Sequence, residues 1–334
     1  MPLSIARSTN GLTTRPEILA MDAPCPPPDH AAPATTVSLV LGSGGARGLA
    51  HIGVIQWLTE NGYAIRSIAG SSIGALVGGI HANRKLAVYA DWVLALERMH
   101  VLRLLDPTIG SAGLFKGERI IQVLRELVGD ADIAALPIRF TAVATDLASG
   151  EEVWLQQGPL FDAIRASMAT PSVFTPARRG GLTLVDGAVV NPVPVAPTVD
   201  DATDLTIAVD LSGPAEPLPA PAASAPMPGD NRYRRQILNF VDSLRPQPKP
   251  KPDGDRRGMI DVAFASMQTM QDTITRLKLA GCPPDVLVQV PRNACGFFEF
   301  WRAEELIALG RERAAQAMAA ALQGRHMAAR AQGR

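Results

Sequence analysis

The sequence predicts an α/β fold, in which a β-sheet is covered by helices on both faces. The chain has 334 residues, enough for one large α/β domain or two smaller ones. Hydrophobic residues make up 47 % of it and charged residues 19 %, which excludes a wholly disordered chain. Short β-branched runs alternate with stretches of helical periodicity, and this alternation favours a sheet between layers of helices.

The predicted elements follow these two kinds of pattern. Strands are predicted at residues 37–41, 66–70, 138–145, 152–155, 182–185, 205–211 and 285–290. Helices are predicted at residues 47–60, 73–98 with a break near Asn83, 118–128, 159–169, 259–280 and 302–323. Hydrophobic residues recur at helical spacing in the segment 259–280, which indicates a helix that packs on the core.

Two segments differ in composition from the rest of the chain. Residues 1–35 are rich in Pro, Ala and Thr without periodicity, so we expect a disordered leader. A Pro-rich stretch at about 213–258 is expected to be a surface insertion that holds one short amphipathic helix. Residues 36–323 then form one domain around this insertion, and residues 324–334 form a flexible tail.

Charge and cysteine content exclude several classes of protein. Lys plus Arg and Asp plus Glu are both 32, so no net charge favours nucleic acid as a partner. Cys25, Cys282 and Cys295 lack CxxC spacing, so neither a disulfide framework nor a zinc site is predicted. No apolar run reaches the roughly 18–20 residues of a membrane span, and no signal-peptide pattern is present. We therefore expect a cytoplasmic protein.

A glycine-rich loop, LGSGGARG at residues 41–48, lies between the first predicted strand and a helix. Its free N–H groups at the helix start fit a negative group, either a phosphate or a developing oxyanion. The dinucleotide pattern GxGxxG needs glycine where Arg47 stands, and the P-loop needs lysine where Leu49 stands. Both nucleotide patterns fail at a required residue, which leaves an oxyanion loop or a tight turn that binds nothing.

The second motif is GSSIG at residues 70–74, which fits GxSxG with Ser72 at its centre. It follows a predicted strand and leads into a helix of small residues, which is the arrangement of a nucleophile elbow. The positive end of that helix favours negative charge beside Ser72. The alternative is that Ser71 or Ser72 only caps the helix.

The third motif, DGA at residues 186–188, is weak alone because Asp-Gly is also a favoured hairpin turn. The histidines narrow the mechanism. A Ser-His-Asp hydrolase of the α/β-hydrolase type needs a histidine after the acid, where the sequence has His326 in its Ala-rich terminal segment. The others lie in the leader or on predicted helices upstream: His30, His51, His81 and His100. The motifs present thus favour a serine nucleophile with a carboxylate base.

These three motifs, in this order, resemble the patatin-like phospholipases, which are serine acyl hydrolases with a Ser-Asp dyad. The resemblance extends to the bacterial lysophospholipase and esterase branch related to neuropathy target esterase. Stretches that carry it include GLFKGERI at 113–120, ATDLASGEEV at 144–153, ASMATPSVFTP at 166–176 and GFFEFWRAEELIALG at 296–310. It covers residues 36–323 except the insertion, and it implies a three-layer α/β/α sandwich with a mostly parallel central sheet.

The resemblance also implies roles for the motif residues. Ser72 is the nucleophile and Asp186 is its base, which we expect to be buried because a carboxylate in water is a weak base. The oxyanion-hole N–H groups come from Gly44, Gly45 and Ala46, and Arg47 supports the loop or the anionic intermediate. Ser43 stands where the family usually has the first glycine of this loop, which we expect to alter the loop little. No metal or organic cofactor is implied.

The implied substrate is a lipid ester, either a phospholipid or a lysophospholipid. A catalytically silent lipid-binding or scaffold module of the same fold is the alternative. Candidates for a cap over the site are Trp92, Leu96, Met99, Leu102 and Leu104, and candidates for lipid contact are Phe297, Phe298, Phe300 and Trp301. A helix packed in the core would also explain the first group, and packing at the start of the last predicted helix is the favoured interpretation of the aromatic group. The insertion helix at 231–245 has an apolar face and a basic edge, which suits peripheral contact with an anionic membrane.

Overall fold

The computed structural model of the chain describes residues 34–104, 106, 113–217 and 259–332. The amphipathic helix predicted at 231–245 lies outside these residues, as do almost all of the predicted leader and most of the predicted insertion. The described residues belong to one unit that begins at Ala34.

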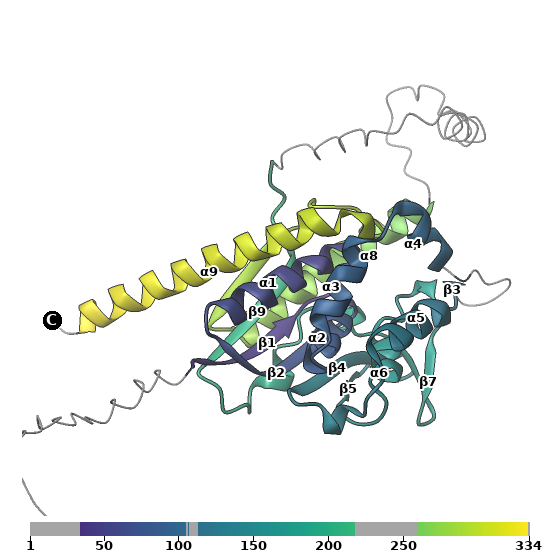
Figure 1. Cartoon of the computed structure of the whole chain (residues 1–334), viewed down its shortest axis with the longest axis horizontal. Helices are drawn as coiled ribbons and strands as arrows, with labels where there is room; N and C mark the ends of the chain where they lie inside the picture. Colours follow the sequence, from purple (N-terminus) through teal and green to yellow (C-terminus); the bar gives the residue numbers. More distant parts are fainter. Residues whose placement is uncertain (1–33, 105, 107–112, 218–258, 333–334) are drawn as a thin grey trace, which may run out of the picture. The chain divides into compact units, whose positions relative to one another are not determined.

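A mostly parallel sheet of eight strands is the centre of this unit. Figure 1 shows the sheet among the helices that cover it. The strand order is β10-β9-β1-β2-β4-β8-β7, and β5 pairs with β4 beside that path. The strands are β1 Thr36–Leu41, β2 Ala64–Ser71, β4 Arg139–Asp146, β5 Glu152–Leu155, β7 Ala177–Arg179, β8 Leu182–Asp186, β9 Leu205–Gly213 and β10 Val286–Pro291. The five strands from β10 to β4 run parallel, whereas β5, β8 and β7 join by antiparallel pairing. The predicted fold class is confirmed.

Helices cover both faces of the sheet. They are α1 Ala50–Glu60, α2 Ile73–Ala82, α3 Leu86–Leu94, α4 Arg98–Leu104, α5 Glu118–Val128, α6 Leu160–Ser167, α8 Met259–Gly281 and α9 Ala303–Gln332. Successive side chains of a strand point to opposite faces. Leu39 and Leu41 of β1 therefore enter the large core with α1, α2 and α9, whereas Val40 packs with Val193 and with Leu279 of α8.

Several element boundaries differ from the sequence prediction. The break expected near Asn83 is present between α2 and α3, but a second break follows α3, where the Glu97 N–H donates to His100 Nδ1 and starts α4. The helix predicted from residue 47 begins instead as a 3-10 turn, Gly45–Leu49. The tail predicted to be flexible from residue 324 continues α9 as far as Gln332, because its Ala, Gln and Arg residues favour a helix.

Helices α1 and α9 lie side by side with their backbones almost in contact, and Figure 1 shows α9 running along α1. A Cβ atom at Gly53 would stand 1.9 Å from the Ile307 carbonyl oxygen, and one at Gly310 would stand 2.0 Å from that of Ala50. Only glycine fits at these two positions. The last helix is therefore part of the main core.

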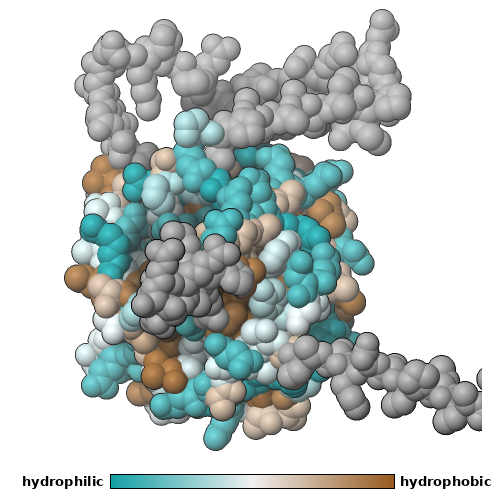
Figure 2. Space-filling model, turned by 90° about the vertical axis from the view of Figure 1, so that its left-hand side faces the viewer, coloured by the Kyte–Doolittle hydropathy of each residue, from teal (hydrophilic) through white to brown (hydrophobic). Residues whose placement is uncertain are grey.

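The face of the molecule in Figure 2 is mainly hydrophilic, with hydrophobic residues scattered among the hydrophilic ones. No helix within the described ranges is long and apolar enough to cross a membrane. Beside the sheet, a separate two-stranded pair joins β3, Gly113–Phe115, to β6, Ser172–Phe174. These two short strands matter for the site, because β6 follows directly on the segment that contacts Asp186.

Candidate active site

The register of the sheet brings Ser72 and Asp186 together. Ser71 at the end of β2 pairs with Val143 in β4, and the next residue, Ala144, pairs with Asp186 at the end of β8. Ser72 Oγ donates a hydrogen bond to Asp186 Oδ2 at 2.7 Å, although 114 residues separate the two along the chain. The two side chains predicted as a dyad thus lie in direct contact.

The backbone at Ser72 is strained, as in a nucleophile elbow. Its φ is 57° and its ψ is −123°, a conformation that non-glycine residues seldom adopt. The two glycines of the motif make this sharp turn sterically possible. A Cβ atom at Gly70 would stand 2.5 Å from the carbonyl carbon of Gly74, and one at Gly74 would stand 2.0 Å from the Leu41 carbonyl oxygen. The prediction of a turn from strand into helix at Ser72 agrees with this geometry.

Ser167 links the backbone of Ser72 to strand β4. The Ser72 N–H donates to Oγ of Ser167 at 3.0 Å, and that hydroxyl donates to the Val143 carbonyl at 2.6 Å. Ser167 is fully buried, so each of these polar groups is satisfied without water. The end of α6 therefore fixes the position of Ser72 against β4.

The carboxylate of Asp186 is buried and receives three hydrogen bonds. The hydroxyls of Ser72 and Thr170 both donate to Oδ2 at 2.7 Å, and the Ala188 N–H donates to Oδ1 at 2.9 Å. Burial raises the pKa of Asp186 above its ordinary value, and the three hydrogen bonds offset part of that rise. The expectation that Asp186 is buried agrees with its exposed fraction of 3 %.

The three N–H groups predicted as oxyanion donors differ in their hydrogen bonding. Within the described residues, the N–H groups of Gly44 and Gly45 have no hydrogen-bond acceptor. Ala46 differs from the prediction, because its N–H donates to the Phe297 carbonyl at 2.9 Å and is no longer available to a ligand. Arg47 donates to the carbonyls of Gly44 and Arg292, so its observed contacts support the loop.

Two cavities meet at Ser72. One, of about 460 Å³, has polar walls near the dyad and is lined by Ser43, Gly44, Arg47, Ser72, Thr170 and Asp186, by Ala265, Met267, Gln268 and Gln271 of α8, and by Phe297 and Phe298. The other, of about 90 Å³, is narrow and almost wholly apolar. Predicted cap and aromatic residues line the narrow one: Trp92, Leu96, Leu104, Phe297, Phe298 and Phe300.

The remaining cap and aromatic candidates whose side chains the structure describes are not among the residues that line the narrow cavity. Met99 is more than half exposed, and the ring of Trp301 lies under the guanidinium of Arg98 at 5.1 Å. The side chain of Leu102 lies outside the described residues. The narrow cavity is therefore bounded by part of each predicted group, namely α3, the end of α4 and the segment before α9.

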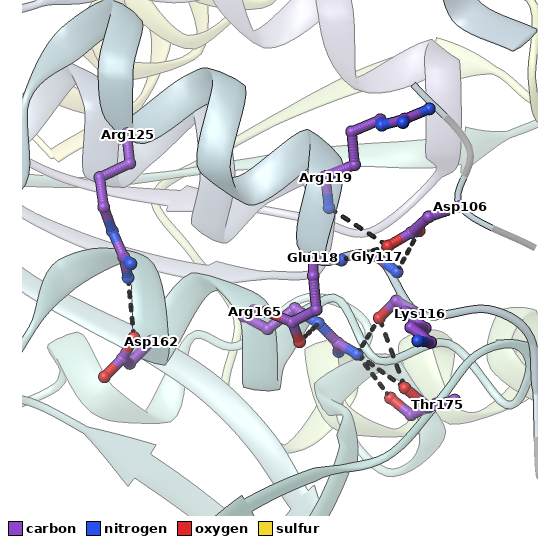
Figure 3. Close-up of polar contacts among 9 residues, drawn as sticks. All are labelled: Asp106, Lys116, Gly117, Glu118, Arg119, Arg125, Asp162, Arg165 and Thr175. Carbon is purple, nitrogen blue, oxygen red and sulfur yellow. Dashed lines mark hydrogen bonds and ion pairs between the residues drawn. The ribbon is translucent and has the colours of Figure 1, made fainter. Parts of the chain in front are cut away.

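Figure 3 shows a polar junction between elements that also contribute to the lining of the narrow cavity. Arg165 of α6 donates to the carbonyls of Lys116 and Thr175, and so ties β3 to β6. The carboxylate of Asp106 accepts the N–H groups of Gly117 and of the two residues after it, which caps α5. Both contacts hold elements that contribute side chains to the narrow cavity.

The histidines whose side chains the structure describes do not contact the dyad. His51 is fully buried, its Nε2 donates to the Gly42 carbonyl at 2.8 Å, and burial lowers its pKa to about 4. Neither cavity at Ser72 is lined by His51, His81 or His100. The side chain of His326 lies outside the described residues, as does His30. In the described part of the chain, no cluster of three or more His, Cys, Asp or Glu side chains is placed to hold a metal ion.

The sequence analysis missed Thr170 and Ser167 as parts of this site. Both belong to the stretch 166–176, which was noticed only as a family feature. The available signal is the presence of two hydroxyl residues at the end of a predicted helix, close to a strand that precedes the DGA motif. Hydroxyl residues at the end of a helix are common, and the sequence does not indicate that these two contact Ser72 and Asp186.

Comparison with known proteins gives matches over most of the chain. A family model described as patatin-like phospholipase matches residues 39–199. Uncharacterized NTE family proteins of Mycobacterium tuberculosis and Mycobacterium bovis are 41 % identical to this chain in an alignment of 330 residues that covers 85 % of this chain and 91 % of each relative. A protein of Pyricularia oryzae named lysophospholipase is 28 % identical in an alignment of 285 residues that covers 82 % of this chain and 18 % of that protein.

Proposed function

Because this chain belongs to the patatin-like phospholipase family, in the branch of the NTE family proteins, we propose that it hydrolyses carboxylic esters of lipids. The proposed substrate is a phospholipid or lysophospholipid, the latter in keeping with the name of the Pyricularia oryzae relative. One observation carries the proposal: Ser72 Oγ donates to Asp186 Oδ2 at 2.7 Å, so a nucleophile and its base are in contact.

The proposed reaction passes through an acyl-enzyme. Ser72 Oγ attacks the ester carbonyl and gives its proton to Asp186 Oδ2, while the N–H groups of Gly44 and Gly45 stabilise the oxyanion. Collapse of this intermediate breaks the ester bond, and the leaving alcohol takes the proton from Asp186. Water then attacks the acyl-enzyme, giving one proton to Asp186, which returns it to Ser72 as the fatty acid leaves.

Burial makes Asp186 a better base than an aspartate in water. It raises the pKa of the carboxyl group, and the strength of a general base rises with its pKa. The hydrogen bond from the Ala188 N–H keeps Oδ1 occupied, so Oδ2 is the oxygen that faces the nucleophile. This arrangement supports proton transfer without a histidine.

The two cavities support a lipid as the substrate. The narrow apolar cavity begins at Ser72 and suits the first methylene groups of an acyl chain, since its walls are aromatic and aliphatic. The larger cavity is lined by Arg47, Gln268 and Gln271 as well as by the dyad, and such polar groups suit the ester and the head group. The carbonyl would then lie between them, beside the glycine-rich loop.

The test compares the wild type with Ser72→Ala, Asp186→Asn and the control Ser71→Ala on phospholipids, lysophospholipids and short p-nitrophenyl esters. We expect the first two variants to lose activity about a thousand-fold, because members of a catalytic unit fail together. Ser71→Ala should lose little, and a chelator should have no effect. Fluorophosphonate labelling that persists in Ser72→Ala would contradict the assignment, whereas a wild type that binds lipid without hydrolysis would indicate a silent module.

Peripheral contact with an anionic membrane stays a prediction. It rests on the sequence of residues 231–245, which lie outside the described residues. We expect deletion of these residues to weaken binding to anionic liposomes and to keep hydrolysis of a soluble short-chain ester. Equal liposome binding by the deletion variant would contradict the prediction.

A further inference from the structure

Thr170 makes the same contact with Asp186 as the nucleophile does. It lies three residues after the end of α6, and its side chain is almost completely buried. Its Oγ1 donates to Asp186 Oδ2 at 2.7 Å, which is also the distance from Ser72 Oγ to that oxygen. Two hydroxyl protons therefore converge on one carboxylate oxygen, and it is the oxygen that receives the proton in the proposed reaction.

Backbone hydrogen bonds hold Thr170 in this position. The preceding residue, Ala169, accepts the Asp186 N–H at 3.0 Å, so the segment is attached to the aspartate itself. The Thr170 carbonyl accepts the N–H groups of Val173 and Phe174 at 3.1 and 2.9 Å. The alternative acceptor for the hydroxyl, the Met168 carbonyl, lies at 3.4 Å, so the shorter contact with Asp186 is favoured.

A hydroxyl that donates to a carboxylate favours its ionised form. It also occupies one side of Oδ2 and leaves the other side for Ser72, which fixes the direction of proton transfer. We propose that Thr170 is a positioning residue of the Ser72–Asp186 dyad, which orients Oδ2 and sets how strongly Asp186 binds a proton. The inference rests on the proposed function, because it needs Asp186 to act as a base.

The surroundings of Asp186 make this contribution measurable. Ser72 from the elbow, Thr170 from the segment after α6 and the Ala188 N–H from the following turn contact the carboxylate, and none of these groups is charged. In the cavity at the dyad, Arg47 of the glycine-rich loop is the charged lining side chain besides Asp186 itself, and α8 contributes the neutral Gln268 and Gln271. Loss of the Thr170 hydroxyl should therefore appear directly in the titration of Asp186.

The test measures kcat/KM against pH for a soluble p-nitrophenyl ester and, in parallel, the rate of fluorophosphonate labelling. Thr170→Val keeps the shape of the side chain and removes the donor, whereas Thr170→Ser keeps the donor. Loss of the donor raises the pKa of Asp186, so the carboxylate stays protonated to higher pH. We expect the acid limb of Thr170→Val to move to higher pH by about one unit, and that of Thr170→Ser to stay at the wild-type position.

Thr170→Ala is a second variant without the donor and should move the limb in the same direction. An acid limb that stays in place in both Val and Ala variants, or that moves equally in Thr170→Ser, would overturn the inference. A rise in KM without a shift of the limb would also overturn it and indicate a substrate contact. The wild type could hydrolyse no lipid ester while the acid limb of fluorophosphonate labelling still moves to higher pH in Thr170→Val. In that case the lipid substrate is wrong and the inference stands.

Discussion

Replacement of Gly74 by alanine tests whether close backbone contact at this glycine positions Ser72. A Cβ atom there would lie 2.0 Å from the Leu41 carbonyl oxygen and 2.8 Å from that of Gly42, and both oxygens belong to backbone. Contacts under 3.0 Å require a shift, so α2 and the end of β1 must separate by about 1 Å. A displacement of this size at a catalytic group costs about 100-fold in rate.

The stability change in Gly74→Ala has two opposing parts. Overpacking against a rigid neighbour costs up to about 3 kcal/mol, and the better helix propensity of alanine returns about 1 kcal/mol. We expect a loss of about 2 kcal/mol in the free energy of unfolding by denaturant titration, with kcat/KM for a soluble ester lowered about 100-fold.

Gly79→Ala in the same helix is the matched control. Its Cβ would meet only side-chain atoms, those of Leu160, Ile164 and Phe140, at 3.0 to 3.1 Å. These atoms can move by a few tenths of an ångström, so this variant should keep most of the activity and lose less stability. Wild-type kcat/KM in Gly74→Ala would refute the reasoning that backbone contact at this glycine positions Ser72.

Three further predictions concern the wall of the narrow cavity, a buried histidine and the polar junction. Trp92→Ala enlarges the cavity and should raise the preference for longer acyl chains about tenfold in relative kcat/KM, while Val88→Ala, at an exposed position of the same helix, should not. The pKa of His51 is about 4 in the folded chain and about 6.5 in the unfolded chain, so protonation favours unfolding between these two pH values. We expect the free energy of unfolding, measured by denaturant titration, to fall by about 3 kcal/mol as the pH drops from 6.5 to 4. His51→Asn should not show this fall. Arg165→Ala leaves two carbonyls without their donor and should lower the free energy of unfolding by about 2–4 kcal/mol, and Arg165→Lys should restore only part, since lysine lacks the planar fork. Equal thermal stability of wild type and Arg165→Ala would contradict the last of these.

Local motifs predicted the parts of the site whose geometry depends on local chain conformation. GxSxG is such a motif, because both glycines are needed for the turn at Ser72, and the requirement can be read from five residues. The position of Asp186 after a strand was also predictable, although its contact with Ser72 was implied only by the order of the motifs. The main strands were predictable for the same reason, since each carries its own β-branched run.

Contacts between distant segments were not predictable from these patterns. The acceptor of the Ala46 N–H is the backbone carbonyl of Phe297, and a backbone carbonyl has no residue-specific signature. Strands β3 and β6 have three residues each, too few for an alternating pattern to stand out. The hydroxyl of Thr170 is a common group whose partner is decided by tertiary packing, so its contact with Asp186 was also missed.

The strand order has a consequence for how the protein is made. Strand β1 is synthesised before β9 and Phe297, yet one of its edges is covered by β9, and the loop after it is held by Phe297. A nascent chain that ends at residue 199, where the family match ends, therefore carries a central strand with one unpaired edge and a glycine-rich loop without its contact to Phe297. Unpaired strand edges promote aggregation during folding. We expect hydrolytic competence to appear only after β9 and the segment with Phe297 have been synthesised and have folded onto β1 and its loop.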